Sequence, residues 1–229
     1  MNQSEITIAC VLRTPAKSKN RNKQKFYGND DVVRLKKGVD NFLKMPHEFV
    51  CLTDRDDVET NTIKLIGEPT ETPGWWAKLE LFRPELFKRP VLYIDLDMII
   101  CGDLDEMVRK FKGNPFMLLG NSRKTGFGSG MIYFEGKHND LWEKYIADPK
   151  YYQMKYSKKS RLGDQAFIED NTPFRPMNET VNRNWFQRFE YDTVPHPDSK
   201  ILVCVGKQNK LHKQEFQDNP WVLKYWRNI

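Results

Sequence analysis

The sequence lacks several features that would assign it to a particular class of protein. Its 229 residues contain no run of 18 apolar residues, so we predict no transmembrane helix. The first residues, Met1 to Glu5, lack the basic-then-apolar layout of a signal peptide, so we expect a cytoplasmic location. There is also no internal repeat, no low-complexity segment and no G-x-x-x-x-G-K-S/T phosphate-binding loop.

Cysteine is scarce, with four residues and no C-x-x-C pair. Cys10, Cys51 and Cys204 fall in apolar, strand-like runs, and Cys101 follows another. Buried cysteines of this kind behave as small apolar side chains. The pattern favours reduced thiols over disulfides or a zinc site.

The composition is that of a folded protein. Hydrophobic residues make up 39% of the chain, which has 14 Phe and 6 Trp. This content excludes a disordered chain, and the length suits one domain over residues 1–229. The net charge of +6 permits phosphate-rich partners without demonstrating one.

Hydrophobic periodicity predicts an alternation of strands and helices. We expect strands at residues 6–12, 48–53, 62–66, 91–94, 116–119, 131–134 and 201–205. We expect helices at residues 32–43, 75–82, 103–108 and 140–146, and another from residue 163. Strand, helix and strand in this order indicate an α/β fold with parallel pairing and right-handed crossovers.

Two carboxylates follow the most apolar of these strands. Val91 to Ile94 reads as a strand buried on both faces, and Asp95, Leu96 and Asp97 come directly after it. Desolvating two like charges together is expensive unless a partner compensates them. Mg²⁺ or Mn²⁺ is such a partner, because these ions take one or two carboxylates together with phosphate oxygens. Ligands of open α/β sheets also bind at this end of the strands.

The helix before this strand carries a lysine with two open interpretations. Trp75, Leu79 and Phe82 share one face in α-helical spacing, and Lys78 lies between them. Lys78 is either a core lysine whose amine reaches solvent, or a lysine aimed at a substrate. After the strand, Asp103 is expected to cap a helix. Together with Asp105 it is better explained by the helix dipole than by metal binding.

Two basic segments also allow two interpretations. Lys17 to Lys25 is either a solvated loop or a mobile arm that closes over a phosphorylated substrate. Lys150 to Arg161 interleaves lysines with tyrosines, which suits stacking combined with phosphate contact, although a solvated surface loop explains it as well.

Five blocks in order carry a resemblance to a known family. The blocks are Trp76-Ala-Lys-Leu, Val91 to Asp97, Gly128 to Ile132, Gly163-Asp-Gln and Val203-Cys-Val-Gly-Lys. They resemble the A-type nucleotide-sugar glycosyltransferases, above all the glycogenin and lipopolysaccharide-galactosyltransferase family, family eight. The resemblance covers roughly residues 5–215. It implies a single Rossmann-like GT-A domain with a mixed, mainly parallel sheet flanked by helices. Residues 1–100 would form its nucleotide-binding half, 101–215 its sugar and acceptor half, and 216–229 a tail.

The resemblance assigns roles at the reaction centre. Asp95 and Asp97, with Leu96 between them, would hold Mn²⁺ or Mg²⁺ that bridges the diphosphate of a UDP-sugar. Lys78 would face the donor sugar or its phosphate. Asp164 and Gln165 would contact the sugar or the acceptor near the anomeric carbon.

The remaining donor contacts come from four other segments. Ser129 and Gly130 would line the sugar pocket by close backbone approach. Gly206, Lys207 and Lys210 would grip the diphosphate. The nucleoside would be bordered by Leu12, Arg13, Thr14 and Asp54.

The sequence departs from the family at the third metal ligand. The family's histidine on the last strand would fall near Val203, where Cys204 is adjacent. His212 is a candidate substitute, and a surface histidine is the other interpretation. A site of two carboxylates, phosphates and water is also open.

The implied reaction is transfer of a hexose or pentose to a hydroxyl group, with retention at the anomeric carbon. A divalent ion and lysines would stabilise the leaving diphosphate. The acceptor is open between hydroxymethylated DNA, as glycosylated by bacteriophage transferases, and a glycan core. The oligomeric state is open too. The alternative function is a non-catalytic nucleotide or nucleic-acid binding module. A metal-dependent nuclease or phosphatase would want more clustered acids than Asp95 and Asp97.

Overall fold

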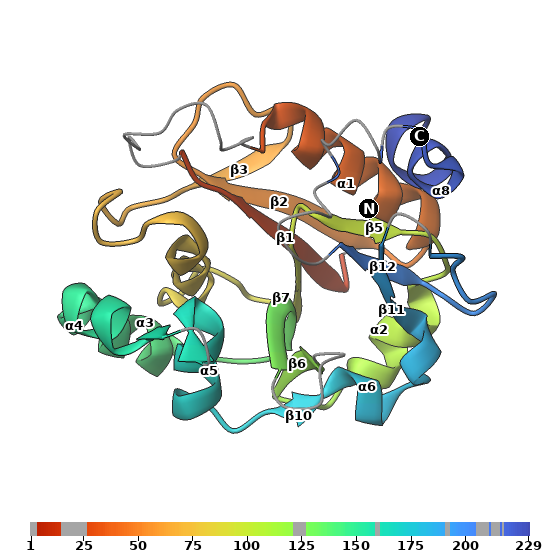
Figure 1. Cartoon of the computed structure of the whole chain (residues 1–229). Coiled ribbons are helices and arrows are strands. Elements are labelled where there is room, and N and C mark those ends of the chain that lie inside the picture. Colours follow the sequence, from red (N-terminus) through yellow and green to blue (C-terminus); the bar gives the residue numbers. More distant parts are fainter. Residues whose placement is uncertain are drawn as a thin grey trace.

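The chain alternates strands and helices along its length (Figure 1). The computed structural model describes residues 4–14, 27–120, 127–158, 161–190, 193–204, 211, 216 and 218–229. The strands are β1 (Ile6–Leu12), β2 (His47–Thr53), β3 (Asn61–Lys64), β4 (Val91–Ile94), β5 (Met98–Ile100), β6 (Phe116–Gly120), β7 (Phe127–Phe134), β8 (Ser157–Lys158), β9 (Arg161–Leu162), β10 (Arg175–Pro176), β11 (Phe186–Phe189) and β12 (Ile201–Cys204). The α-helices are α1 (Asn29–Phe42), α2 (Asp105–Phe111), α3 (Asn139–Ala147), α4 (Pro149–Lys155), α5 (Gly163–Asn171), α6 (Met177–Thr180) and α8 (Pro220–Val222). Short helices of other types are η1 (Gly74–Phe82), η2 (Arg183–Trp185) and η3 (Leu223–Arg227).

The central sheet has seven strands in the order β10-β6-β7-β4-β1-β2-β3. Strand β1 pairs in parallel with β2 and β4, while β7 runs antiparallel to β4 and β6. The pairs β2–β3 and β10–β6 are parallel as well. The sheet is therefore mixed and mainly parallel, as the sequence predicts.

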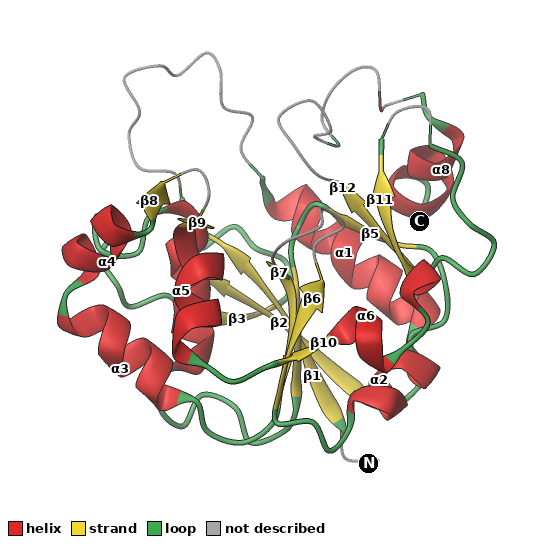
Figure 2. Cartoon of the chain, turned by 60° about the horizontal axis from the view of Figure 1, so that its bottom comes forward, coloured by secondary structure: helices red, strands yellow, loops and turns green. Residues whose placement is uncertain are grey.

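Apolar side chains cover both faces of this sheet. Along β1, Ile6, Ile8 and Cys10 belong to the core cluster that includes α1 and α2, whereas Ala9 belongs to the cluster with η1, α3 and α5. This division follows from the period of two in a strand, which points successive side chains to opposite faces. Figure 2 shows the same layers, with α1, α2 and α6 on one side of the sheet and α3, α4 and α5 on the other.

A second sheet, of three strands in the order β11-β12-β5, stands apart from the first. Strand β5 follows β4 after only three residues, yet it pairs antiparallel with β12 near the end of the chain. The sequence prediction places strands at 91–94 and 201–205 but none at residues 98–100, where the structure has β5. The chain therefore changes sheets at Asp95–Asp97.

The helix that carries Lys78 differs from its prediction. Residues 74–82 form a 3-10 helix, η1, with three residues per turn instead of 3.6. Side chains three apart therefore share a face, and Trp76, Leu79 and Phe82 are buried together. Trp75, predicted to lie on the core face, is 53% exposed instead.

Two other local predictions also change. The segment from Lys150 to Arg161 is not a loop throughout, because its first part belongs to α4. The Asp148 side chain caps this helix by accepting a 3.0 Å hydrogen bond from the Tyr151 N–H. Helix α2 begins at Asp105, and Asp103 accepts a hydrogen bond from the Asp105 N–H just outside it.

All four cysteines are free thiols, three of them buried. No helix among the described residues combines the length and the apolar composition that crossing a bilayer requires.

Candidate functional site at the carboxyl edge of the sheet

The predicted site residues gather where three parallel strands end. Arg13 and Thr14 follow β1, Asp54 follows β2 and Asp95 follows β4. Because β1 is parallel and adjacent to both other strands, these ends lie at the same edge of the sheet. Gly130 lies at this edge too, since β7 is antiparallel to β4 and pairs Met131 with Ile94.

A tight turn fixes the two carboxylates of the D-x-D sequence. The Asp95 N–H donates to the Gly130 carbonyl at 2.8 Å, and the Met98 N–H donates to the Asp95 carbonyl at 3.2 Å. Leu96 is buried between the two aspartates and anchors the turn in the core. Gly130 lies close to the first aspartate, because an added Cβ would stand 3.2 Å from Asp95 Oδ2 and would displace the end of the Met98 side chain.

Lys78 lies at the centre of the buried polar cluster. Its ammonium is 3.2 Å from Asp95 Oδ1 and 3.2 Å from Asp164 Oδ2. It also donates to the carbonyl and the hydroxyl of Ser129, both at 3.0 Å. The Ser129 hydroxyl donates in turn to Asp164 Oδ2 at 2.6 Å. Lys78 is thus a buried lysine that joins η1 to β4, β7 and α5, and it does not extend to solvent.

The charges in this cluster shift one another's pKa. Burial acts to lower the pKa of Lys78, but the carboxylates of Asp164 and Asp95 outweigh it and raise that pKa. Desolvation raises the pKa of Asp95 to about 6 against the lowering effect of Lys78, and Asp97 contributes to the rise by repulsion. A further positive charge placed beside Asp95 would stabilise its ionised form and lower its pKa again.

Two tyrosines complete the surroundings of the carboxylates. The Tyr27 hydroxyl donates to Asp97 Oδ2 at 3.1 Å, and the Tyr93 hydroxyl donates to Asp95 Oδ1. Sequence reasoning missed both. Tyr93 had a signal, since it lies two residues before Asp95, a spacing that returns to the same face of a strand. Tyr27 had none, because its contact spans 70 residues.

The residues predicted to border the nucleoside include three, Arg13, Thr14 and Asp54, that contact one another at one corner of this edge. The Thr14 N–H and hydroxyl both donate to Asp54 Oδ1, at 2.8 and 3.0 Å. Arg13 lies 3.7 Å from the same carboxylate and donates to the Gly67 carbonyl at 2.5 Å. Leu12, also predicted here, is buried in the core. The structure therefore brings three of these four side chains together.

Glu80 holds the loop beside this corner and was also missed. It is fully buried, and its carboxylate accepts from the N–H groups of Ile66 and Gly67 at 2.7 and 3.1 Å. Arg83 lies 3.1 Å away as its counter-charge. A pattern in the sequence does point to it, since a glutamate in an otherwise apolar helix requires a partner.

The C-terminal part of the predicted site is only partly described. Val203 pairs with Met98, so β12 ends beside Asp97, which is where the family's histidine would lie. Cys204 is buried in the core at this point. The predictions for Gly206, Lys207, Lys210 and His212 fall outside the described residues, as does the basic segment Lys17 to Lys25. Within the described residues, no group of three or more His, Cys, Asp or Glu side chains is arranged so that it could hold a metal ion.

Gln165 follows Asp164 in the first turn of α5 and is half-buried. Lys155 ends α4, with its ammonium over the rings of Tyr156 and Tyr151, 5.2 and 5.9 Å from their centroids. Lys158 is exposed on β8. These basic and aromatic groups therefore lie outside the Lys78 cluster, at the base of the β8–β9 hairpin.

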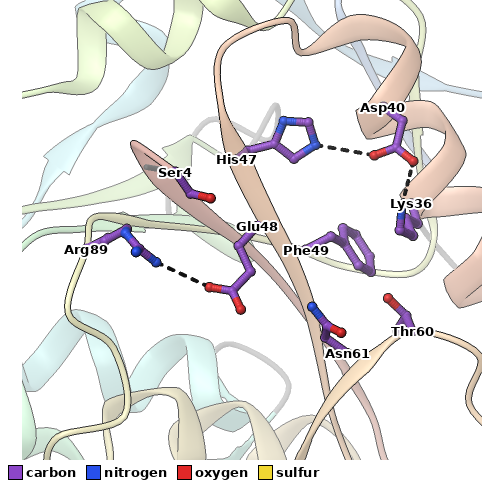
Figure 3. Close-up of a pocket in the computed structure, with 9 residues that line it drawn as sticks. All are labelled: Ser4, Lys36, Asp40, His47, Glu48, Phe49, Thr60, Asn61 and Arg89. Carbon is purple, nitrogen blue, oxygen red and sulfur yellow. Dashed lines mark hydrogen bonds and ion pairs between the residues drawn. The ribbon is translucent and has the colours of Figure 1, made fainter. Parts of the chain in front are cut away.

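A hollow of about 610 Å³ lies at the opposite edge of the sheet (Figure 3). It is lined where β1, β2 and β3 begin, and its charged groups pair with one another. Asp40 binds Lys36 and His47, and Glu48 binds Arg89 at 3.5 Å. None of the predicted site residues lines it.

No protein-family model matches the sequence, and a search of curated proteins finds no match. Solved structures do match. The chain aligns with the glycosyltransferase GlyE of Streptococcus pneumoniae TIGR4 at a TM-score of 0.59 and 14% identity, over 96% of this chain and 62% of GlyE. It aligns with the galactosyltransferase LgtC, determined with donor and acceptor sugar analogues, at a TM-score of 0.56 and 11% identity, over 94% of this chain and 92% of LgtC. The bifunctional glycosyltransferase WbbM aligns at 0.52 and 11%, over 97% of this chain and 51% of WbbM.

The chain has a GT-A fold. Its mixed, mainly parallel sheet with flanking helices superposes on these structures over nearly the whole chain, so the predicted fold class is confirmed. At identities of 11–15% the likeness concerns the fold, and the chain spans about 62% of the length of GlyE. Function has to be argued from the site.

Proposed function

We propose that this protein is a metal-dependent glycosyltransferase that moves a sugar from a nucleotide-diphosphate donor, a UDP-sugar, to a hydroxyl acceptor. One observation carries the proposal. The Asp95–Asp97 turn contacts the Lys78, Ser129 and Asp164 cluster at the carboxyl edge of a GT-A sheet. This edge is where open α/β sheets bind ligands.

The two aspartates fit a hard divalent cation. Both carboxylates lie on one turn, and the pKa of Asp95 is raised to about 6, so an added positive charge favours its ionised form. Asp95 and Asp97 would hold Mn²⁺ or Mg²⁺, with donor phosphate oxygens and water supplying the rest of the shell. When bound, the ion would neutralise the charge that develops on the leaving diphosphate.

The other residues bind and orient the donor. Lys78 places a fixed positive charge beside both Asp95 and Asp164, in a position to stabilise a phosphate or the donor sugar. Ser129 holds one oxygen of Asp164, so this carboxylate keeps one orientation next to the anomeric carbon. Asp164 and Gln165 would stabilise the positive charge of an oxocarbenium-like centre. The resemblance to family eight supports retention of the configuration at the anomeric carbon.

The nucleoside would lie at the corner of Arg13, Thr14 and Asp54. Their mutual hydrogen bonds and the support of Gly67 keep this corner rigid before a donor arrives. Gly206, Lys207, Lys210 and His212 remain predicted diphosphate and metal contacts. The acceptor is a glycan or hydroxymethylated DNA, the latter as in bacteriophage DNA modification.

A UDP-release assay tests the proposal. The protein is incubated with UDP-glucose or UDP-galactose and Mn²⁺, first alone and then with glycan and hydroxymethylated-DNA acceptors. We expect Asp97→Asn to lower UDP release by about 100-fold or more, because it removes a charged group that stabilises the transition state. Titration of Mn²⁺ and UDP by calorimetry should show the same loss in binding.

The control is Asp56→Asn, which changes an exposed aspartate in the same way. Circular dichroism should show that both variants keep the wild-type fold. Near wild-type turnover of Asp97→Asn at saturating Mn²⁺ would contradict the metal site. UDP binding without release of sugar from any donor would favour a non-catalytic binding module instead.

A further inference from the structure

Trp75 is the one tryptophan of six that lies exposed on the surface. Its side chain is 53% exposed, whereas Trp76, Trp142, Trp185 and Trp226 are all below 9% and Trp221 is half-buried. Tryptophan normally stabilises a protein by burying its large apolar ring, and an exposed indole makes no such contribution. The exposure of Trp75 therefore needs another explanation. The hydrophobic core does not supply one, because Trp76 fills the core position of this helix.

The backbone holds Trp75 in one place. A Cβ on Gly163 would stand 2.5 Å from Trp75 Nε1 and 2.9 Å from its Cδ1, so the indole lies directly against this glycine. Gly163 also has a φ of +74°, which favours glycine. Gly74, just before the tryptophan, has a φ of +56°. The indole therefore packs against the start of α5, at a position where a larger residue than glycine would collide with it.

Trp75 shares a helix face with the centre of the site. In a 3-10 helix residues three apart eclipse each other at a rise of about 2 Å per residue, so Trp75 lies about 6 Å along the axis from Lys78. Its other neighbour, Gly163, directly precedes Asp164. Trp75 thus borders the Lys78 and Asp164 pair from both chain segments.

Contacts within the site run in a definite order. Asp97 and Asp95 form one end, Lys78 bridges Asp95 to Asp164, and the chain of contacts ends at Gly163 and Trp75. In the proposed reaction the diphosphate binds at the aspartates. The transferred sugar then lies toward Asp164, so the groups that continue this line of contacts beyond Asp164 are placed to meet the acceptor.

We propose that Trp75 is the stacking platform of the acceptor subsite, and that the acceptor is a glycan that lays the apolar face of a sugar ring on the indole. The proposal rests on the proposed transferase function. The groups beside the indole favour a sugar over a nucleic acid. Asp164 and Gln165 are hydroxyl-binding groups, and Lys78 is buried between two carboxylates, so it presents no surface charge to the backbone of a nucleic acid.

Indole NMR tests the platform directly. Protein labelled with ¹⁵N at its indoles is saturated with UDP and Mg²⁺, which is diamagnetic, and titrated with maltose, lactose and cellobiose. Trp75→Phe identifies the Trp75 signal by its disappearance. We expect at least one disaccharide to shift the Trp75 signal. Its affinity should fall about three- to tenfold in Trp75→Ala, the range of an aromatic stacking contact, and less in Trp75→Phe.

Val194→Ala is the matched control, since Val194 is an exposed apolar residue on the loop after β11 and should leave sugar affinity unchanged. If none of the disaccharides shifts the Trp75 signal, the platform is refuted. A shift with single-stranded oligothymidine alone would assign the surface to nucleic acid and also overturn the proposal. UDP release from UDP-glucose or UDP-galactose by the wild-type protein with Mn²⁺, measured separately, distinguishes these results from failure of the transferase function.

Discussion

Lys78 carries more of the site's electrostatics than any other described side chain. Asp95, Asp97 and Asp164 bring three negative charges to one edge of the sheet, and Lys78 neutralises two of them from within the core. A buried pair loses much of its solvation, so removing one partner leaves an uncompensated charge. We therefore expect the lysine to stabilise the fold, whatever its part in the proposed donor site.

We predict that Lys78→Met lowers the free energy of unfolding by about 3–5 kcal/mol, because Asp164 is left as a buried, unpaired carboxylate. Urea unfolding at neutral pH measures this loss. The double variant Lys78→Met, Asp164→Asn should recover part of it, since the pair is then removed as a unit. A single variant within about 1 kcal/mol of wild type, the value of a surface ion pair, would contradict the prediction.

Single residues were predictable where their chemistry is local. The D-x-D sequence and Lys78 stood out because carboxylates and a lysine interrupt apolar segments. Tyr27 acts through a partner that a local pattern does not reveal, since it binds Asp97 across 70 residues. The role of Trp75 depends on whether its helix has 3 or 3.6 residues per turn, a difference that composition does not encode.

At the scale of elements, Asp105 joins α2 to the end of α1. Its carboxylate accepts from the N–H groups of Lys44 and Met45 at 2.8 and 2.7 Å. Burial acts to raise the pKa of Asp105, but these backbone hydrogen bonds outweigh it, and the pKa is lowered. The ionised carboxylate thus replaces the hydrogen bonds that the turn after α1 cannot make within a helix.

We predict that Asp105→Ala lowers the free energy of unfolding by about 1–3 kcal/mol at pH 6, because two backbone donors lose their acceptor. The contribution of a carboxylate with a lowered pKa is complete above its unfolded value of about 3.9 and is lost as pH falls through the folded value. The gap between variant and wild type should therefore narrow below about pH 4.

Urea unfolding at a series of pH values measures this gap, with the exposed Asp56→Ala as control. A gap that stays constant into the acid range would show that packing, and not the charge of Asp105, links the two helices.

Elements with strong periodicity were predicted well. The strands at β1, β2, β4 and β6, and helices α1 and α3, lie within a few residues of their predicted bounds because their apolar patterns are continuous. Strand β5 was missed because it has only three residues, too few to show a period of their own. Helix α4 was missed because its residues are half-exposed or exposed and leave no apolar period.

At the scale of the whole molecule, the site depends on contacts between the two sheets. The turn at Asp95–Asp97 begins in the central sheet and ends in β5, which is held by β12. Leu202 on β12 is fully buried and lies opposite Ile99. The positions of the two aspartates relative to each other therefore depend on a strand near the end of the chain.

We predict that Leu202→Ala and Leu141→Ala both cost about 2–5 kcal/mol of unfolding free energy, because each leaves a cavity at a fully buried leucine. Leu202→Ala should also weaken UDP binding with Mg²⁺ by several fold, and more than Leu141→Ala, since Leu202 lies opposite the strand that follows Asp97, whereas Leu141 on α3 packs in the other core cluster. Calorimetry under conditions where both variants are folded measures the difference. Equal UDP affinities would show that β12 stabilises the fold without shaping the site.

The change of sheets at Asp95–Asp97 also sets an order for biosynthesis. The first four strands can pair with one another while the C-terminal part is still being made, because β1, β2, β3 and β4 are close in sequence and adjacent in the sheet. Strand β5 cannot pair until β12, its antiparallel partner, has been synthesised about 100 residues later. Asp95 and Asp97 would thus be synthesised well before β12, the strand that holds β5 in place. The nascent chain would be able to bind a donor only once β12 has been made.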